Sequence, residues 1–376
     1  MKILYIINED WFFVSHFLGI ARAARAAGHQ ILVATRVADH GAVIRAEGFE
    51  LHPIEQDRGR LSPGGALGTI LSLRRLIRIE RPDLVHALST QSTLLGGLAA
   101  RFAFAPALAL SPTGLGHFWT EPGLASLLAR QATRWLLRVI RTAPALIVFF
   151  ENREDPAELG FDSADSRIVI LGGAGVDPAA FPAQPPPQAP PTRIAVVARM
   201  LRSKGIAEAV EAISLARSNG LDVTLDLWGS PDPGNRNTFS EADLAGWNRR
   251  AGICWRGSTN DVAGVWRDSH IALLLSHREG LPRSLVEAAA SARPIIAADV
   301  PGCRAVVEDG VEGLLVAPRN AEAAARAIER LARDADLRAR MGAAARARFE
   351  AEFSLDRVVA KVLAAYAGIQ SGLGAR

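Results

Sequence analysis

The chain has 376 residues with a formal net charge of +4, and 49% of its residues are hydrophobic. This length exceeds the roughly 250–300 residues at which a single hydrophobic core stops growing, so we expect two domains, and the apolar content excludes a disordered chain. The two cysteines, Cys254 and Cys303, are too few for a disulfide scaffold, which favours a reducing, cytoplasmic compartment.

The start of the chain predicts neither a signal peptide nor a membrane anchor. The apolar run Ile3–Ile7 ends at the polar residues 8–10, which leaves it too short for a signal-peptide core. The longest charge-free stretch, residues 102–120, contains two prolines and two glycines, so no bilayer-spanning helix is expected. The sequence therefore predicts a protein that is soluble or peripheral on a membrane.

Short apolar runs alternate with helical patterns along the first half of the chain. Phe17–Ala27 and Ile70–Glu80 have the periodicity of amphipathic helices. This alternation predicts a parallel sheet connected by crossover helices. The strand-like runs are Ile3–Ile7, Gln30–Ala34, Leu84–Ala87, Ala107–Leu110, Leu146–Phe150 and Ile168–Leu171.

A proline-rich segment, residues 182–191, interrupts this pattern and is predicted to be a stiff, extended connector. The alternation then restarts, with strands predicted at Ile194–Ala198, Val223–Trp228, Ile253–Arg256, Ile271–Leu275, Ile295–Ala298 and Gly313–Val316. The fold class is therefore α/β, with two doubly wound, Rossmann-like domains at residues 1–185 and 186–354. Residues 355–376, with a helix at about Leu355–Ala367, are expected to pack back on the first domain. Ligands of such sheets bind beyond the carboxyl ends of the strands, so the expected site is a cleft shared by the domains.

Basic residues are concentrated in the first 150 residues, where 16 Lys and Arg stand against 10 Asp and Glu. Arg130, Arg134, Arg138 and Arg141 recur at helical spacing, with leucines and Trp135 between them. Two interpretations are open: a core helix with a solvated basic face, or a basic, aromatic face resting on an anionic membrane surface. No nucleic-acid partner is expected, because the rest of the chain balances its charge and carries no nucleic-acid motif.

Two cations follow the predicted strand Ile194–Ala198 and precede a helix. They are Arg199 and Lys204, and Lys204 is one of only three lysines among 43 basic residues. A lysine beside Gly205 therefore suggests that a compact point charge is needed there. The free N–H groups of a helix N-terminus favour anions, so this segment suits a diphosphate, although a loop with solvated cations remains the alternative.

Two glutamates follow the predicted strand Ile271–Leu275. Pro282 is typical of a first helical residue, so Glu279 and Gly280 are placed in the loop and Glu287 inside the helix. Eight residues separate the carboxylates, so they cannot share one short helix face and Glu279 must reach in from the loop. A loop carboxylate suits a sugar hydroxyl or a developing positive charge, whereas a helical carboxylate suits a ribose diol.

No metal site is expected. The only Asp-x-Asp triplet, residues 334–336, lies in an Ala- and Arg-rich helical pattern, and the histidines lack metal-ligand spacing. A departing diphosphate would then be stabilised by Arg199 and Lys204 in place of a cation. After the next strand, Gly302 would let the backbone approach a ligand closely.

These motifs resemble those of the family 4 glycosyltransferases. The resemblance is carried by Arg199 with Lys204-Gly205, by Glu279-Gly280-Leu281-Pro282 with Glu287, and by Gly175-Val176-Asp177. It implies a retaining enzyme of the GT-B fold, in which two Rossmann-like domains face each other across a cleft. It also implies a nucleotide-sugar donor, expected to be UDP-linked, and no cofactor.

The same resemblance implies roles for the individual residues. Arg199 and Lys204 would hold the donor diphosphate as catalytic cations, and Glu287 would bind the ribose. Glu279, with the backbone N–H groups of Gly280 and Leu281, would face the transferred sugar as the catalytic carboxylate.

Two segments of the first half resemble a bacterial subgroup that extends glycans linked to lipid diphosphates. They are Ser15-His16-Phe17 and Thr113-Gly114-Leu115-Gly116. The resemblance implies a polyprenyl-diphosphate-linked acceptor, an anionic membrane surface as partner, and a peripheral place on the inner face of the cytoplasmic membrane. His16, Thr113 and Gly114 would lie on the acceptor side. Many relatives have a histidine where Thr113 stands, and His117 follows four residues later.

The leading interpretation is a hexosyltransferase that moves a sugar with retention from a UDP-sugar to a lipid-linked saccharide. A nucleotide-sugar epimerase or hydrolase on the same fold is one alternative. A non-catalytic, nucleotide-sugar-binding subunit is another, because residues 9–13 replace the family's Gly-rich phosphate loop. The intact Arg199, Lys204, Glu279 and Glu287 favour an enzyme. The sequence does not name the donor sugar, the acceptor or the linkage.

Overall fold

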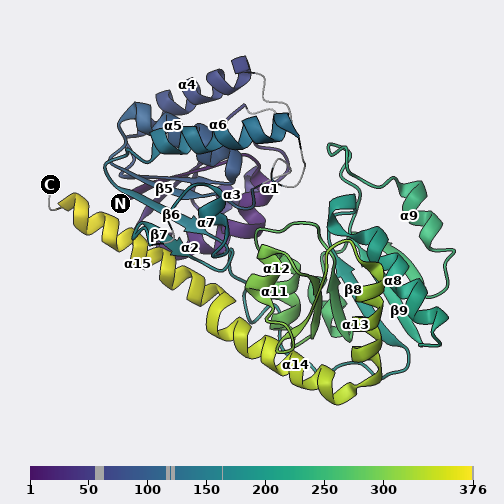
Figure 1. The fold of residues 1–376 in the computed structure, drawn as a ribbon. Helices are drawn as coiled ribbons and strands as arrows, with labels where there is room; N and C mark the ends of the chain where they lie inside the picture. The colour runs from purple at the N-terminus through teal and green to yellow at the C-terminus, as the bar shows by residue number, and fades with distance from the viewer. Residues whose placement is uncertain (56–62, 116–118, 120–122, 163, 375–376) are drawn as a thin grey trace. The chain divides into compact units, whose positions relative to one another are not determined.

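The computed structural model describes residues 1–55, 63–115, 119, 123–162 and 164–374 (Figure 1). The chain divides into two compact units. Unit 1 contains Met1–Gly175 and Leu355–Arg376, and unit 2 contains Val176–Ser354.

In the described residues, unit 1 is built on a parallel sheet whose strands lie in the order β3-β2-β1-β4-β5-β6-β7. Its strands are β1 (Lys2–Ile7), β2 (Gln30–Thr35), β3 (Glu50–Pro53), β4 (Leu84–Leu88), β5 (Ala107–Ser111), β6 (Leu146–Phe150) and β7 (Ile168–Ile170). Its helical segments are α1 (Asp10–Phe12), η1 (Phe13–Phe17), α2 (Leu18–Ala26), α3 (Gly41–Ala46), α4 (Pro63–Glu80), α5 (Thr90–Ala103), α6 (Leu124–Ile140), α7 (Asp155–Glu158) and α15 (Leu355–Gly374).

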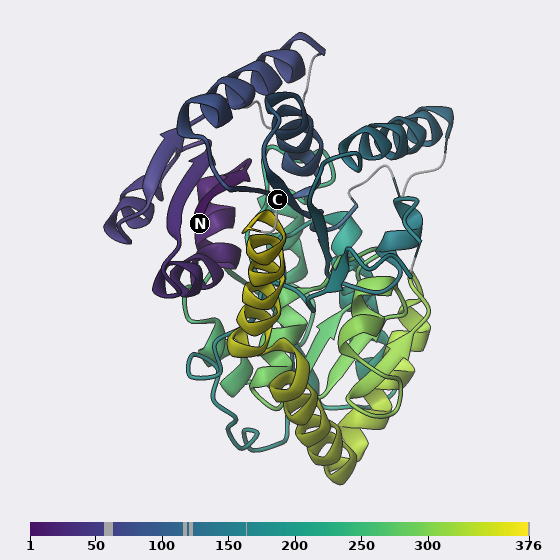
Figure 2. The ribbon, with the colours of Figure 1, turned by 90° about the vertical axis from the view of Figure 1, so that its left-hand side faces the viewer.

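The last helix of the chain, α15, closes one face of the unit 1 sheet. It packs beside α2 (Figure 2), and Val358, Val362 and Tyr366 belong to the same buried cluster as strand residues of β1. The Tyr366 hydroxyl is hydrogen-bonded to His86 Nδ1 at 2.6 Å and to the Tyr5 hydroxyl at 3.0 Å. Because His86, Tyr5 and Tyr366 are buried, this network fixes α15 against the centre of the sheet.

Unit 2 has a second parallel sheet, in the order β10-β9-β8-β11-β12-β13 over the residues described. Its strands are β8 (Thr192–Val197), β9 (Val223–Trp228), β10 (Ile253–Gly257), β11 (Ile271–Leu274), β12 (Ile295–Ala298) and β13 (Gly313–Val316). Its helical segments are η3 (Arg202–Lys204), α8 (Ile206–Ser218), α9 (Glu241–Trp247), α10 (Val262–Arg267), α11 (Arg283–Ala290), α12 (Pro301–Val306), α13 (Ala321–Arg333), α14 (Ala335–Arg348) and η4 (Phe349–Phe353).

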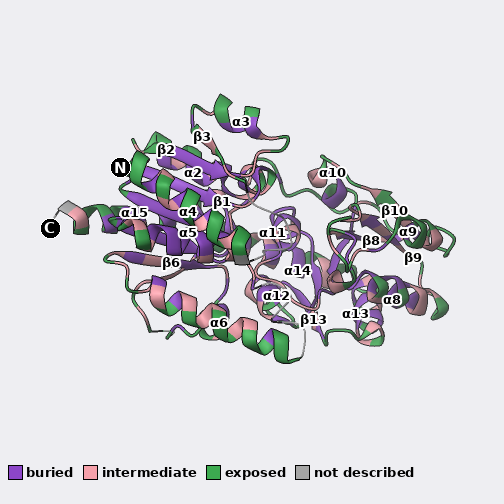
Figure 3. Ribbon diagram, turned by 90° about the horizontal axis from the view of Figure 1, so that it is seen from above, coloured by how far each residue is buried: buried purple, intermediate pink, exposed green. Residues whose placement is uncertain are grey.

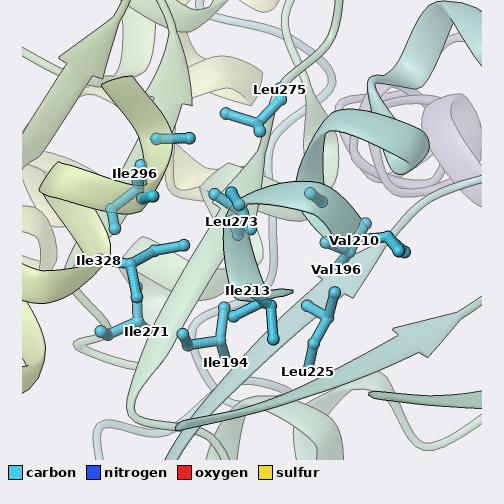
Figure 4. Close-up of a cluster of buried hydrophobic side chains, with 14 of the residues drawn as sticks. Ile194, Val196, Val210, Ile213, Leu225, Ile271, Leu273, Leu275, Ile296 and Ile328 are labelled. Atoms are coloured by element: carbon cyan, nitrogen blue, oxygen red, sulfur yellow. The ribbon is translucent and has the colours of Figure 1, made fainter. Parts of the chain in front are cut away.

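Branched apolar side chains from the strands fill the core of unit 2. Ile194 and Val196 of β8 lie beside Leu273 of β11, and Val210 of α8 and Ile328 of α13 cover them (Figure 4). Alternate strand residues enter a second cluster on the opposite sheet face, which α11, α12 and η4 cover. Burial on both faces is expected of a parallel sheet, and it explains the continuous apolar runs in the sequence.

The division between the units lies at residue 175, ten residues before the predicted boundary near residue 185. Val176 and Phe181 are buried in the core of unit 2, and the Val176 N–H donates to the Phe353 carbonyl. The proline-rich segment is also held by unit 2, because Arg293 donates to the Gln184 carbonyl at 2.9 Å. His270 Nε2 is likewise hydrogen-bonded to the Pro187 carbonyl at 2.9 Å. The segment predicted to be a stiff connector between the domains is therefore part of unit 2.

Candidate functional site

The strand order of unit 2 reverses between β8 and β11. The chain passes from β8 outward to β9 and β10 on one side, and from β11 outward to β12 and β13 on the other. The loops that leave the carboxyl ends of β8 and β11 therefore diverge, and ligands of open α/β sheets bind at such a point. These two loops carry Arg199, Lys204 and Glu279.

Lys204 and Glu279 meet at this point. Lys204 Nζ lies 2.5 Å from Glu279 Oε1, and Ser276 Oγ donates to the same carboxylate oxygen at 2.6 Å. Both charged side chains are largely buried, so each is the partner that makes burial of the other tolerable. The sequence predicted both residues at this edge, whereas the role of Ser276 was missed although it directly follows the strand.

Two glycines hold the backbone of these loops in place. Gly205 has a φ of +68°, and a Cβ at that position would overlap the Leu275 carbonyl at the end of β11. A Cβ on Gly302 of α12 would lie 2.5 Å from the Gly280 carbonyl oxygen and 2.7 Å from that of Glu279. The segment with Glu279 is therefore packed against α12 at a separation that only glycine allows.

A further contact joins the two loops. The His277 N–H donates to the Ser203 carbonyl at 2.9 Å, and His277 Nε2 lies 2.8 Å from Glu208 Oε1. Glu208 lies in the first turn of α8, so His277 connects the β11 loop to both sides of Lys204. Residues 208 and 277 are far apart in the sequence, and no local pattern pointed to this pair.

Arg199 does not share a carboxylate with Lys204. Its guanidinium donates to Asp232 Oδ2 at 2.8 Å, and its side chain is 52% exposed. Asp232 lies in the segment that follows β9. The cation is therefore at the carboxyl edge of the sheet as predicted, but its half-exposed guanidinium is paired with a largely buried carboxylate that the sequence did not indicate.

Glu287 is buried within α11 and is paired with Arg283. Arg283 Nε donates to Glu287 Oε1 at 2.7 Å, in the i, i+4 arrangement that a helix allows. Burial raises the pKa of Glu287, and the Arg283 guanidinium opposes this shift without cancelling it. The i, i+4 spacing in the sequence could have identified Arg283. Pro282 is the N-cap of α11, one position earlier than predicted.

His16, predicted for the acceptor side, lies within a continuous helical segment. The helix predicted to begin at Phe17 begins seven residues earlier, because α1 starts at Asp10 and continues through the π-helical turn η1 into α2. The His16 Nδ1 and Ser15 Oγ atoms are 2.7 Å apart, and the imidazole lies against the Phe12 ring. π-helical turns inside α-helices are frequent at functional sites.

Thr113 and Gly114 follow β5. Gly114 has a φ of +68°, and its carbonyl accepts a hydrogen bond from Thr90 Oγ1 at the start of α5. The loops after β4 and β5 are therefore joined, with Thr113 half-buried between strand and loop. His117 lies outside the described residues.

Carboxylates fill the position after β1 where the family has a Gly-rich loop. Glu9 accepts two hydrogen bonds from the Arg36 guanidinium, at 2.6 and 3.2 Å. Asp10 Oδ2 accepts the backbone N–H groups of Ala38 and His40, each at 2.8 Å. Both carboxylates are buried, so the loop after β1 holds two acidic side chains that are already bound within unit 1.

The Asp-x-Asp triplet does not lie inside a helix as predicted. Asp334 is the N-cap of α14, and its Oδ1 accepts the Leu337 N–H at 2.8 Å. Glu50, His52 and Glu80 form a different group, not predicted from sequence, whose potential ligand atoms lie within 4.8 Å of one another. Lys2 Nζ is 2.8 Å from Glu80 Oε2, so a protein cation already neutralises one of these carboxylates.

Comparison with known proteins identifies both units. Residues 2–147 match the family model Glycosyl transferase 4-like, and residues 179–348 match Glycosyl transferases group 1. A curated relative from Campylobacter jejuni is 23% identical over 86% of this chain and 88% of its own length. It is the N,N'-diacetylbacillosaminyl-diphospho-undecaprenol alpha-1,3-N-acetylgalactosaminyltransferase.

Solved structures agree on the fold. The sucrose-phosphate synthase of Thermosynechococcus elongatus superposes with a TM-score of 0.79 at 18% identity, over 99% of this chain and all of the other. The Anabaena protein HepE, in complex with UDP, superposes with a TM-score of 0.76 at 16% identity, over 98% of this chain and all of the other. The chain is therefore a glycosyltransferase of the GT-B fold, with a glycosyl transferase 4-like unit 1 and a glycosyl transferases group 1 unit 2.

Proposed function

We propose that this glycosyltransferase moves a sugar from a UDP-sugar to a lipid-linked saccharide, with retention of the anomeric configuration. The observation that carries the proposal is the contact between Lys204 and Glu279 at the switch point of unit 2. It joins a cation suited to a diphosphate with a carboxylate suited to a sugar, on the two loops where ligands of this sheet type bind.

In the proposed reaction, the donor diphosphate takes Glu279's place on Lys204. The Lys204 ammonium and the N-terminus of α8 then face the phosphate oxygens, and Glu279 becomes free to face the transferred sugar. The bond from the sugar C1 to the diphosphate oxygen breaks with its electron pair on the diphosphate. A new bond forms from C1 to an acceptor hydroxyl oxygen, whose proton leaves with the diphosphate.

Two further residues support donor binding. Arg199 would leave its exposed pair with Asp232 and add a second cation at the diphosphate. Glu287, oriented by Arg283, would accept hydrogen bonds from the ribose hydroxyls, as the family resemblance implies. We propose that these groups make a divalent metal unnecessary for turnover.

The relatives support the substrate classes. The Anabaena protein was solved in complex with UDP, and the Campylobacter relative is named for a diphospho-undecaprenol acceptor. We accordingly propose a polyprenyl-diphosphate-linked acceptor and a peripheral location on the inner face of the cytoplasmic membrane. In the described part of the chain, each helix is too short or too polar to cross a bilayer.

A panel of nucleotide sugars tests the proposal. The donor is selected by thermal shift, turnover is then followed against a membrane lipid extract, with and without a chelator, and NMR reports the anomeric configuration of the product. We expect one UDP-sugar to stabilise the protein, and product to form at an unchanged rate in chelator. Nucleotide release without acceptor would indicate the hydrolase or epimerase, and donor binding without turnover on any acceptor would indicate the non-catalytic subunit.

A further inference from the structure

The helix α6 does not present the basic face that its sequence predicts. Arg134 Nε donates to the Glu158 carbonyl at 2.9 Å, and Arg141 donates to the Gly160 carbonyl at 2.9 Å and pairs with Asp165. These two half-buried guanidinium groups are directed at the segment after β6, within unit 1. The expectation of a solvated basic face is therefore wrong for half of the four arginines.

The solvent face of α6 is apolar instead. Leu124 is 71% exposed, Leu128 is 60% exposed and Trp135 is 61% exposed, and Leu127 is also exposed. Figure 3 shows exposed stretches along α6. Positions 124, 128 and 135 are spaced so that they share one side of the helix. The exposed Gln131 lies between Leu128 and Trp135 on this side, so the apolar residues form a leucine cluster at the start of α6 and a separate Trp135. Exposed apolar side chains are ordinary when they are scattered, but a cluster of them marks an interaction surface.

A second helix, α4, repeats this arrangement. Leu67 is 57% exposed and Leu71 is 52% exposed, one turn apart on α4. Both α4 and α6 pack beside α5, and all three helices contribute to the same buried cluster on one face of the unit 1 sheet. Of the twelve large hydrophobic residues exposed in the described ranges, seven lie on α4 and α6, so the exposure is concentrated in one helical layer.

The apolar ends of the two helices share an edge of the sheet. α4 runs into the amino end of β4, so its first half lies toward the carboxyl edge, and α6 begins after the loop that leaves the carboxyl end of β5. That loop contains Thr113 and Gly114, the predicted acceptor-side residues. The leucines in the first halves of α4 and α6 therefore lie at the edge to which an acceptor is expected to come.

Cations follow these apolar residues on both helices. Arg75 and Arg78 are exposed on α4 beyond the leucines, and Arg138 is exposed on α6 one turn after Trp135. Glu80, which pairs with Lys2, is the only acidic residue in the sequence of either helix. Apolar residues flanked by cations and free of exposed carboxylates match an anionic lipid surface, where leucine and tryptophan enter the interface and arginine meets the headgroups.

We propose that this surface, formed by Leu67, Leu71, Leu124, Leu127, Leu128 and Trp135 and called here the lipid-docking surface, inserts into an anionic bilayer. The proposal deepens the proposed function, because it assigns the membrane partner to a definite face and brings a lipid-linked acceptor to the Thr113–Gly114 edge. Binding to lipid is nevertheless measured without any turnover.

Flotation with vesicles of phosphatidylglycerol and phosphatidylcholine tests the surface. We expect the double variant Leu124→Ser, Leu128→Ser to bind at least about tenfold more weakly than the wild type, because each exposed leucine would lose its apolar contact with lipid. Val43→Ser and Val311→Ser, single exposed valines on other elements, are the matched controls and should bind as the wild type does. Pure phosphatidylcholine vesicles should bind less protein, and Arg75→Gln with Arg138→Gln should remove that difference.

Three outcomes would overturn the docking surface. They are a wild type that does not float, a double variant that floats as well as the wild type, and self-association in solution that the leucine substitutions abolish, which would make the surface an interface between two copies. UDP binding by thermal shift and turnover on detergent-solubilised acceptor are measured on the same variants. If both persist while flotation is unaffected by the substitutions, the docking surface fails and the proposed function stands.

Discussion

The two units have the same sheet topology around their switch points but use polar residues there in opposite ways. In unit 2, Lys204 and Glu279 sit on loops at the carboxyl edge, in a pair that a ligand can replace. In unit 1, the carboxylates of Glu9 and Asp10 are buried and fully bound by Arg36 and by backbone N–H groups. Unit 1 adds a buried network around His86.

This difference teaches that topology locates a potential site but not its chemistry. Lys204 and Glu279 are largely buried, but a ligand diphosphate can replace the carboxylate as the partner of the ammonium, so the cation exchanges one ionic partner for another. A buried, saturated polar group instead contributes to one fixed arrangement and becomes costly when a partner is lost.

Removal of the Lys204 ammonium should have the largest effect. Lys204→Ala removes a preorganised cation, so we expect kcat to fall by roughly 10²–10³, with UDP binding less affected. The control is Lys361→Ala in unit 1, whose ammonium donates to the Ile170 carbonyl and should leave kcat unchanged. An unaltered kcat in Lys204→Ala would mean that the charged pair of unit 2 has no more catalytic role than the fixed polar groups of unit 1.

Acid should destabilise the protein through His86 of unit 1. Burial lowers the pKa of His86 from 6.5 to about 3. Between these two pH values the unfolded chain binds a proton on His86 and the folded chain does not. His86 therefore costs no stability above pH 6.5, and the free energy of unfolding falls as the pH is lowered below that value. We expect a loss of about 2 kcal/mol in the free energy of unfolding between pH 7 and pH 5.

Chemical denaturation across this pH range measures the slope, and His86→Gln should flatten it. Because a substitution at the buried His86 can prevent folding, an NMR titration of the His86 imidazole in the wild type provides a second measurement. A His86 imidazole that becomes protonated above pH 5 in the folded protein would contradict the prediction.

Gly302→Ala tests whether the close packing of α12 against the loop with Glu279 outweighs the higher helix propensity of alanine. The new Cβ would meet the Gly280 carbonyl oxygen at 2.5 Å, so the loop with Glu279 must shift. We expect a destabilisation of about 1 kcal/mol or more, with a parallel loss of kcat. Gly368→Ala on α15, where a Cβ meets nothing within 4 Å, should instead stabilise by roughly 0.5–1 kcal/mol. Equal behaviour of the two variants in thermal unfolding would show that the loop is not held by this contact.

The smallest effect is expected at the pair of the half-exposed Arg199 with Asp232. Asp232→Asn removes the carboxylate that competes with the donor diphosphate for Arg199. Since the Arg199 guanidinium is half exposed, its pair with Asp232 is expected to contribute no more than about 1 kcal/mol, so UDP affinity should rise by no more than about fivefold. Isothermal titration calorimetry measures the change, and weaker binding would mean that Asp232 orients Arg199 productively.

Much of the fold could be predicted from the sequence because parallel strands are buried on both faces. Continuous apolar runs placed β6, β12 and β13 at their observed bounds, and the alternating apolar residues of Val223–Trp228 placed β9. The edge strand β3 was missed, since Glu50-Leu51-His52-Pro53 is only half-buried and carries no apolar run. The boundary was misplaced because a high proline content indicates only that a segment is stiff. The contacts of Phe181 with unit 2 show that the segment before the prolines belongs to the core of unit 2.

The candidate site was predictable where its residues are local in sequence. The loop position of Glu279 and the helical position of Glu287 follow from Pro282 and from spacing. The pairing of Lys204 with Glu279 spans 75 residues, and that of His277 with Glu208 spans 69, so no periodicity reports them. The exposed face of α6 was predicted to be basic, but Arg134 and Arg141 instead bind to the segment after β6.

The return of the chain to unit 1 through α15 has a consequence for biogenesis. Tyr366 completes a polar network with residues made at the beginning of the chain, and all of unit 2 is translated in between. While unit 2 emerges from the ribosome, the nascent first unit holds an apolar sheet face that its own helix has not yet reached. Synthesis should therefore pass through a stage that depends on chaperones, and premature termination before residue 355 should yield a protease-sensitive product.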